Sequence, residues 1–343
     1  MLRTVLALAV VGVVFVGILP RVADLSEARQ QMGSMGGIDI ATLGIVAIAG
    51  LVVYAFVLTA AMPGLSMFQA FVVNQSSTAV ANTMPAGGVL GVGVSYRFYG
   101  SWGHSRSAIT LNVLLTGIGN FMCKLGFPIV ALGLLAMSGN ASLGLLVAAI
   151  VGLVAFSVIF TAGALGLASE RLAQRVGHFV GAVVTRVRGW LRRPAAADAA
   201  AVAVAFRRQS IDLLRSRGLR LSVGIVLYHA TQFALLLVAL RAVGVTAGQV
   251  SWGEALAAYS TASLLGALPL TPGGIGLVEL GLTAALIAAG APNSEAVAAV
   301  LVYRTVSYLL PLPLGAVTYL VWRWNARWRR PAEPAGIELA GAP

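Results

Sequence analysis

Long apolar segments alternate with short polar ones along most of the chain. A helix needs about 20 apolar residues to cross the hydrocarbon core of a bilayer. On this criterion the pattern predicts six membrane-spanning helices, near residues 4–20, 40–62, 107–137, 143–168, 221–244 and 295–322. The first segment also fits a signal peptide, but its small-residue cleavage pattern is poor, so we expect a retained helix.

Two further apolar stretches, 66–100 and 252–290, are each interrupted by proline and glycine. Neither half of either stretch is long enough to cross a bilayer comfortably. Broken backbone inside a membrane is tolerated only where protein or a water-filled cavity satisfies the freed amide groups, and paired breaks in two halves of a chain are typical of transporter binding sites. We therefore expect two re-entrant helical hairpins in an all-α polytopic membrane protein.

Composition supports a membrane protein and gives it an orientation. Hydrophobic residues make up 59% of the chain and charged residues only 10%, whereas soluble globular proteins carry about 25% charged residues. The 23 basic residues outnumber the 11 acidic ones and concentrate in 169–220 and in the tail, 323–343. We expect both regions in the cytoplasm, because positively charged loops stay on that side. No module with interleaved aromatics and a soluble core accompanies the arginines, so nucleic acid is not an expected partner.

The orientation has a consequence for the two hairpins. Counting spans back from a cytoplasmic C-terminus places the N-terminus inside as well, so the first hairpin starts and ends inside and the second starts and ends outside. We therefore expect an inverted repeat, with a first unit at 40–137 and a second at 221–322. Two unrelated kinks are the alternative, because membrane chains rich in glycine and proline produce chance matches.

The connection between the repeats, 169–220, contains an amphipathic stretch. Apolar residues recur at helical spacing between Leu172 and Leu191, with several arginines off that stripe. This pattern suits a helix that lies in the headgroup plane. A solvated loop that only sets the topology is an equally open alternative. An alanine-rich link, 195–205, and a second basic stretch, 206–220, lead into the fifth span.

Two charged residues, Glu279 and Arg304, fall inside apolar sequence in the second repeat. A charge near the centre of a membrane helix costs roughly 2.5 to 3.5 kcal/mol on insertion scales, so each needs a partner or an aqueous cavity. Two interpretations stay open. Arg304 anchors a lipid phosphate, for which a guanidinium is well suited, or the two side chains form a pair that only holds the second hairpin to the last helix.

The hairpin tips are candidates for a second phosphate-binding device. A half-helix that starts just after a break directs unsatisfied N–H groups and a positive dipole end into the membrane interior, where an anion would bind. The candidate residues are Asn82, Pro85, Gly87 and Gly88 at the first tip, and Thr271, Pro272, Gly273 and Gly274 at the second.

Isolated polar residues also occur within the predicted spans. Lys124 and His229 could each line a pathway, although we expect His229, with Gln232, to make hydrogen bonds between helices. The lone Cys123 excludes an intrachain disulfide, and the three histidines are too scattered for a metal motif. The sequence contains no P-loop or nucleophile-elbow motif. We therefore expect no cofactor and no metal.

Taken together, these residues resemble a known family, the flippase-like transmembrane domain of lysylphosphatidylglycerol synthases. The similarity spans roughly residues 40–322. It rests on Asn82 with Pro85 and Gly87-Gly88, on Pro272 to Gly276 with Glu279, and on Arg304 with Tyr308, Pro311 and Gly315. Many relatives place an acidic residue just after the first glycines, where this chain has Val89 and Leu90.

The resemblance implies a membrane protein that translocates lipids. Bifunctional members of the family couple this domain to a cytosolic aminoacyl transferase. Only about twenty residues follow the last predicted span here, so we expect a stand-alone member that is not an enzyme.

We therefore expect a flippase that moves an anionic or modified phospholipid, or a polyprenyl-phosphate-type lipid, across a bacterial cytoplasmic membrane. Arginine at all but one of the 23 basic positions, with heavy use of alanine, indicates a GC-rich bacterial source. The expected partners are membrane lipids with an anionic headgroup, and a homo-oligomer is also open. The alternatives are a membrane scaffold for a separate lipid-modifying enzyme and an integral-membrane enzyme that acts on a lipid headgroup. The expected substrate-binding residues are Asn82, Pro85, Gly87, Gly88, Thr271, Pro272, Gly273, Gly274, Glu279, Arg304 and Tyr308.

Overall fold

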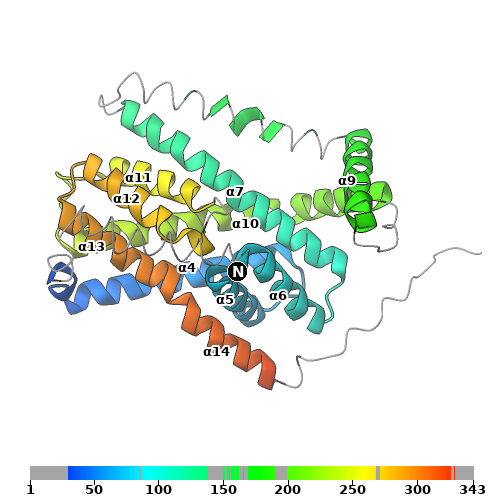
Figure 1. Ribbon diagram of the computed structural model, residues 1–343, viewed down its shortest axis with the longest axis horizontal. Coiled ribbons are helices and arrows are strands. Elements are labelled where there is room, and N and C mark those ends of the chain that lie inside the picture. Colours follow the sequence, from blue (N-terminus) through cyan, green and yellow to red (C-terminus); the bar gives the residue numbers. More distant parts are fainter. Residues whose placement is uncertain are drawn as a thin grey trace, which may run out of the picture.

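The computed structural model describes residues 30–84, 86–137, 150, 153–154, 156–158, 160–161, 165, 169–190, 199–267, 271–325 and 328. Within this part of the chain all regular structure is helical (Figure 1), and no described residue lies in a β-strand. The predicted span 4–20, most of the predicted span 143–168, most of the tail 323–343, and Pro85 lie outside the described residues.

Four helical stretches are long and apolar enough to cross a membrane: Gly37–Ala61, Arg106–Leu135, Ala203–Ala242 and Asn293–Trp324. They overlap four of the predicted spans, 40–62, 107–137, 221–244 and 295–322. They belong to α4 (Gly37–Ala61), α7 (Arg106–Met137), α10 (Ala199–Ala242), and α13 (Asn293–Arg304) with α14 (Pro311–Trp324), which the π-helical turn η3 (Thr305–Leu309) joins. The predicted class, an all-α polytopic membrane protein, is confirmed.

The helix α10 is longer than the sequence pattern predicts. It runs for 44 residues, so the expected link 195–205 is helical from Ala199 onward and the basic stretch 206–220 continues the same helix. Alanine, arginine and leucine are strong helix formers, and the sequence contains no proline between Ala199 and Ala242. Helix propensity therefore outweighs the loop-like composition of this region.

The amphipathic stretch that precedes α10 forms the helix α9 (Glu170–Trp190). It lies at one edge of the molecule (Figure 1), where it packs on α10. The Glu170 carboxylate lies 3.8 Å from the Arg208 guanidinium across this contact. Whether α9 lies in the headgroup plane stays a prediction.

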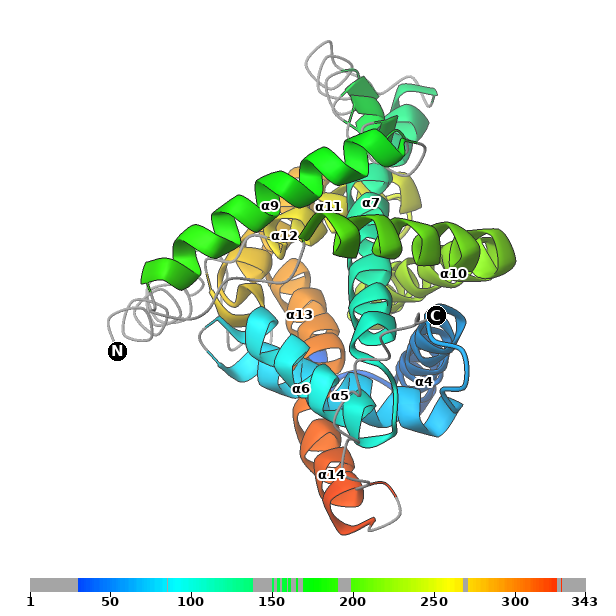
Figure 2. The same cartoon turned by 90° about the vertical axis from the view of Figure 1, so that its right-hand side faces the viewer.

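Both interrupted stretches form pairs of packed helices. The pairs are α5 (Met67–Thr83) with α6 (Gly87–Ser101), seen side by side in Figure 2, and α11 (Trp252–Leu265) with α12 (Leu277–Ala288). Each first helix begins with a serine whose hydroxyl accepts a backbone N–H bond, from Gln69 to Ser66 at 3.2 Å and from Glu254 to Ser251 at 3.4 Å. The re-entrant depth of the pairs and their opposite orientation stay predictions.

Each pair packs on a long helix from the other half of the chain, because α5 contacts α14 and α11 contacts α7. The contact between α5 and α14 is close at Gly315, where a Cβ would lie 2.6 Å from the Gln75 carbonyl oxygen and would overlap the Ala79 side chain. Beside it, the hydroxyl groups of Ser76 and Thr318 share a hydrogen bond of 2.9 Å. Small residues let membrane helices approach in this way. The two halves are therefore interlocked.

Gly315→Ala should push α14 away from α5, because the new Cβ would meet backbone atoms that cannot give way. Overpacking of this kind costs about 1–3 kcal/mol, so we expect a lower midpoint of thermal unfolding in detergent. Tryptophan fluorescence can follow the unfolding, since the Trp322 ring of α14 stacks on Phe98 with centroids 4.4 Å apart. The control is Gly44→Ala on α4, where a Cβ would meet nothing within 4 Å and alanine should stabilise the helix by about 0.5–1 kcal/mol. Equal midpoints for the two variants would contradict the close contact.

Candidate functional site

The break in the second hairpin depends on three glycines. Gly273, Gly274 and Gly276 have φ angles of 58°, 70° and 84°, in a left-handed region that residues with a Cβ rarely adopt. A Cβ at Gly273 would also overlap the ring of Tyr308. The glycines therefore let the backbone turn between η2 (Pro272–Gly274) and α12, and Gly273 lies directly against Tyr308 of the last membrane segment.

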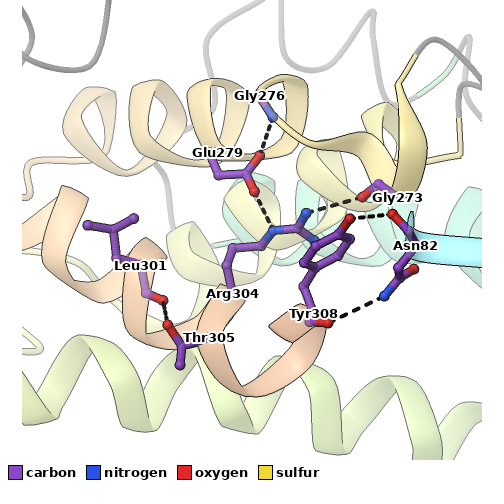
Figure 3. Close-up of polar contacts among 8 residues, drawn as sticks. All are labelled: Asn82, Gly273, Gly276, Glu279, Leu301, Arg304, Thr305 and Tyr308. Atoms are coloured by element: carbon purple, nitrogen blue, oxygen red, sulfur yellow. Dashed lines mark hydrogen bonds and ion pairs between the residues drawn. The ribbon is translucent and has the colours of Figure 1, made fainter. Parts of the chain in front are cut away.

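Glu279 and Arg304 join this break to the end of α13 (Figure 3). The Glu279 side chain is buried, and its carboxylate accepts hydrogen bonds from the Gly276 N–H and from Arg304 Nε, both at 2.7 Å. Arg304 Nη2 also donates to the Gly273 carbonyl at 3.1 Å. The ion pair considered in one of the two sequence interpretations is therefore present, and the Arg304 guanidinium is held by the chain itself.

The N-terminus of α12 already binds a negatively charged side chain of the same helix, Glu279. The N–H of Gly276 is bound to the Glu279 carboxylate, which is well placed in the first turn to interact with the helix dipole. The first hairpin differs, because α6 begins after Ala86, whose φ is 56°, and no side chain caps its first N–H groups. The sequence predicts an anion-binding site at the start of the second helix of each hairpin. In the second hairpin, the Glu279 carboxylate already occupies part of that site.

Tyr308 links the two hairpins. Its hydroxyl donates a hydrogen bond to the Asn82 carbonyl at 2.6 Å, and the Asn82 side-chain amide donates to the Tyr308 carbonyl at 3.4 Å. The Arg304 guanidinium lies 4.4 Å from the centroid of the Tyr308 ring, in a cation–π contact. Asn82 of the first hairpin and Gly273 of the second are therefore connected through two residues of the last membrane segment (Figure 3).

A polar cavity of about 520 Å³ lies beside these contacts, bordered by Asn82, Gly273, Arg304 and Tyr308. Helices from both halves of the chain form the rest of its wall, whose polar side chains include Asn74, Thr78, Asn120, Lys124, His229 and Gln232. Ligand pockets in proteins typically measure about 300–1,000 Å³. The chamber is therefore large enough for a polar group inside an otherwise apolar protein.

Hydrogen bonds between helices fix the polar wall of this cavity. His229 of α10 shares a bond of 3.3 Å with the Tyr259 hydroxyl through Nδ1, and one of 3.2 Å with the Asn120 amide oxygen through Nε2. The Asn120 amide nitrogen donates to the Tyr54 hydroxyl at 3.3 Å. These bonds tie α4, α7, α10 and α11 together, and they confirm the prediction that His229 makes hydrogen bonds between helices.

The remaining predicted site residues lie around the two breaks rather than in the contacts of Figure 3. Thr271 is buried, and its hydroxyl has no hydrogen-bond partner among the described residues. Gly274 packs against the end of α11, and Gly87 packs against the backbone of α5. Gly88 borders a smaller cavity of about 240 Å³. Pro272 begins η2.

Lys124, His229 and Gln232 are already candidate pathway residues from the sequence, but Asn74, Thr78 and Asn120 of the cavity wall are missed by the sequence analysis, although a signal for them exists. Asn74, Thr78 and Asn82 are spaced four residues apart on α5, and Asn120 and Lys124 have the same spacing on α7. Polar residues at every fourth position of an apolar helix mark one face. The signal is weak because single hydroxyls and amides in membrane helices usually serve helix packing.

The fold and the cavity define a multi-pass membrane protein with a polar chamber beside two interrupted helical hairpins. The chain belongs to the family described as the lysylphosphatidylglycerol synthase TM region, whose sequence profile matches residues 4–315. The resemblance noted from the hairpin motifs is thus confirmed. No curated protein is similar enough to count as a match. Membership of the family links the chain to lipid metabolism or transport.

The buried pair of Glu279 and Arg304 should be strongly coupled. Arg304→Met leaves a buried carboxylate without its partner, and breaking a buried ion pair in this way costs about 3–5 kcal/mol. Glu279→Gln should also lower the unfolding midpoint, but the double variant should lose much less than the two single losses combined. Thermal unfolding of the three purified variants measures this coupling. Fully additive losses would show that the two charges act independently.

Proposed function

We propose that this protein transports a lipid across the membrane and holds the anionic headgroup of that lipid in the cavity of about 520 Å³. The substrate is an anionic or modified phospholipid, or a polyprenyl-phosphate-type lipid. The observation that carries the proposal is a cavity with many polar side chains in its wall, bordered by Asn82 just before the first break and by Gly273 within the second. Membership of a family linked to lipid metabolism or transport supports it.

Burying polar groups in a membrane protein costs free energy, and this favours a functional role for the polar chamber. Each unsatisfied polar group at hydrocarbon depth costs several kcal/mol, and ionisable residues within membrane segments commonly mark substrate pathways. Lys124, His229 and Arg304 all border this cavity. A headgroup that crosses the bilayer needs such a polar route, while its acyl chains can remain in the surrounding lipid.

The last membrane segment supplies the hinge in this proposal. Its π-helical turn, η3, separates α13 from α14, and π-turns inside helices occur frequently at functional sites. Pro311 begins α14 one residue after Leu310, which caps this turn, and it lacks the N–H of a regular helical residue. Bending here would let the two halves rock around the cavity, as in transporters built from inverted repeats. In this proposal the bonds between Tyr308 and Asn82 break and re-form during the cycle.

The contacts of Figure 3 suggest different tasks for the residues at the breaks. Because Glu279 already binds the charge of Arg304, Arg304 positions the second hairpin, and the headgroup meets the cavity side of Asn82, Gly273 and Tyr308. We also propose that 169–220 and both termini face the cytoplasm of a bacterial cell, as the arginine distribution predicts.

Filling the cavity should stop transport without unfolding the protein. Thr78 of α5 borders the cavity, so Thr78→Trp should occupy the space of the headgroup. In vesicles that contain fluorescent phosphatidylglycerol, we expect the wild-type protein to move the labelled lipid from the inner to the outer leaflet, where an external quencher extinguishes its fluorescence. Thr78→Trp should slow this at least about tenfold, equivalent to ~1.4 kcal/mol in the barrier.

Thr261→Trp is the matched control, because Thr261 is exposed on α11, and it should leave the rate unchanged. Equal lipid-transport rates for the wild type, Thr78→Trp and Thr261→Trp would show that the cavity takes no part in transport. A wild-type protein that moves neither phosphatidylglycerol, its aminoacylated form nor a polyprenyl phosphate would remove the proposed function.

A further inference from the structure

Two cationic side chains border the cavity within the described part of the chain, Arg304 and Lys124. Arg304 is bound to Glu279 and to the Gly273 carbonyl. Lys124 makes no hydrogen bond or ion pair with any other described residue. The unbalanced positive charge of the cavity therefore resides on Lys124.

The position of Lys124 makes this charge difficult to solvate from outside. It is partly buried and lies 13 residues before Met137, where α7 ends. That is about 20 Å along the helix axis at 1.5 Å per residue, whereas lysines that snorkel to the interface sit near helix ends. The ammonium group therefore needs water or an anion within the cavity itself.

The polar residue one helical turn before Lys124 on α7 is neutral and engaged elsewhere. This residue, Asn120, is bonded to His229 and Tyr54. Lys124 is also the one lysine among 23 basic residues. A lysine presents a compact charge with three rotatable donors on a flexible stem, whereas arginine presents a rigid planar fork. This chemistry suits a group that must bind a phosphate and then release it.

A glutamine in the cavity wall on α5 has a buried acceptor that makes no hydrogen bond within the described part of the chain. Gln75 is only 1% exposed, and its Oε1 has no hydrogen-bond partner among the described residues. A buried acceptor left unsatisfied costs about 1–3 kcal/mol. The cavity wall thus contains a cation without an anion and a residue whose buried acceptor lacks a donor, which matches a ligand that carries a phosphate together with a hydroxyl or ammonium group.

We infer that Lys124 binds the phosphate of the headgroup and that Gln75 accepts a hydrogen bond from the polar group attached to that phosphate. The inference rests on the proposed lipid transport for the source of the phosphate, since a soluble phosphate ester offers the same chemistry. Arg304 and Lys124 then divide two tasks: Arg304 holds the hairpin break, and Lys124 binds the ligand.

The test titrates purified protein with dihexanoyl phosphatidylglycerol and follows binding by tryptophan fluorescence. Lys124→Met keeps most of the side-chain volume and should weaken binding at least about tenfold, equivalent to ~1.4 kcal/mol. Lys124→Arg should retain most of the affinity. Arg220→Met, which removes an exposed charge from α10 outside the cavity, is the control for general attraction to anionic lipid and should bind normally.

Stability without ligand separates a binding role from a structural one. Removing an unpaired buried charge should leave the lipid-free unfolding midpoint of Lys124→Met unchanged or raise it, whereas loss of a structural contact would lower it. Because the chain has one lysine, protein grown with ¹³C-labelled lysine should give one side-chain NMR signal that moves as the lipid binds. A lower midpoint with unchanged affinity, or a signal that does not move at saturating lipid, would overturn the inference.

Two further arms distinguish this inference from the proposed function. The first arm titrates the protein with glycerol phosphate, which has no acyl chains. If it binds as tightly as the lipid and with the same dependence on Lys124, the phosphate that Lys124 binds comes from a soluble ester rather than a lipid. Lysine-dependent binding without lipid transport would remove only the proposed function. Lipid transport that is equally fast in Lys124→Met would remove only the inference.

Discussion

The hydrogen-bonded ion pair between Glu279 and Arg304 is the contact on which the arrangement of both hairpin breaks depends. Each charge alone would be expensive in a membrane, and the short bond of 2.7 Å offsets that cost for both. The pair fixes the start of α12 against the end of α13 and, through Arg304, the backbone of Gly273. Tyr308, one turn further on, extends the connection to Asn82. One buried pair thus brings segments from both halves of the chain to the edge of a single cavity.

The long apolar helices and the two breaks could be predicted from the sequence because their signals are local and strong. Apolar length predicts both ends of α7 to within one residue and those of α4 to within three, and the clusters of proline and glycine predict where the hairpins turn. The pairing of Glu279 with Arg304 was one of two open interpretations. The bond between Tyr308 and Asn82 joins residues 226 positions apart, and no local pattern carries such information. The helix α10 extends well before the predicted span 221–244, because helix propensity continues through its basic segment.

The cavity shows a different limit of sequence analysis. A lone polar residue in a membrane helix usually serves packing, and this expectation holds for His229 and Asn120, which bond to each other across two helices. It does not account for Lys124, which borders the cavity without a hydrogen bond or ion pair among the described residues, or for Gln75, a lining residue whose buried Oε1 atom has no partner there. Only the packed structure separates polar groups that satisfy one another from those left for a ligand.

A cryo-electron microscopy structure of the protein in a bilayer that contains phosphatidylglycerol would test most directly whether the cavity binds a lipid headgroup. We predict headgroup density inside the cavity, between Asn82 and Gly273, with its phosphate within hydrogen-bonding distance of the Lys124 ammonium and with Arg304 still bound to Glu279. A structure in which the two breaks lie far apart, or in which lipid headgroups occupy only the outer surface and Arg304 faces away from the chamber, would contradict the central claim.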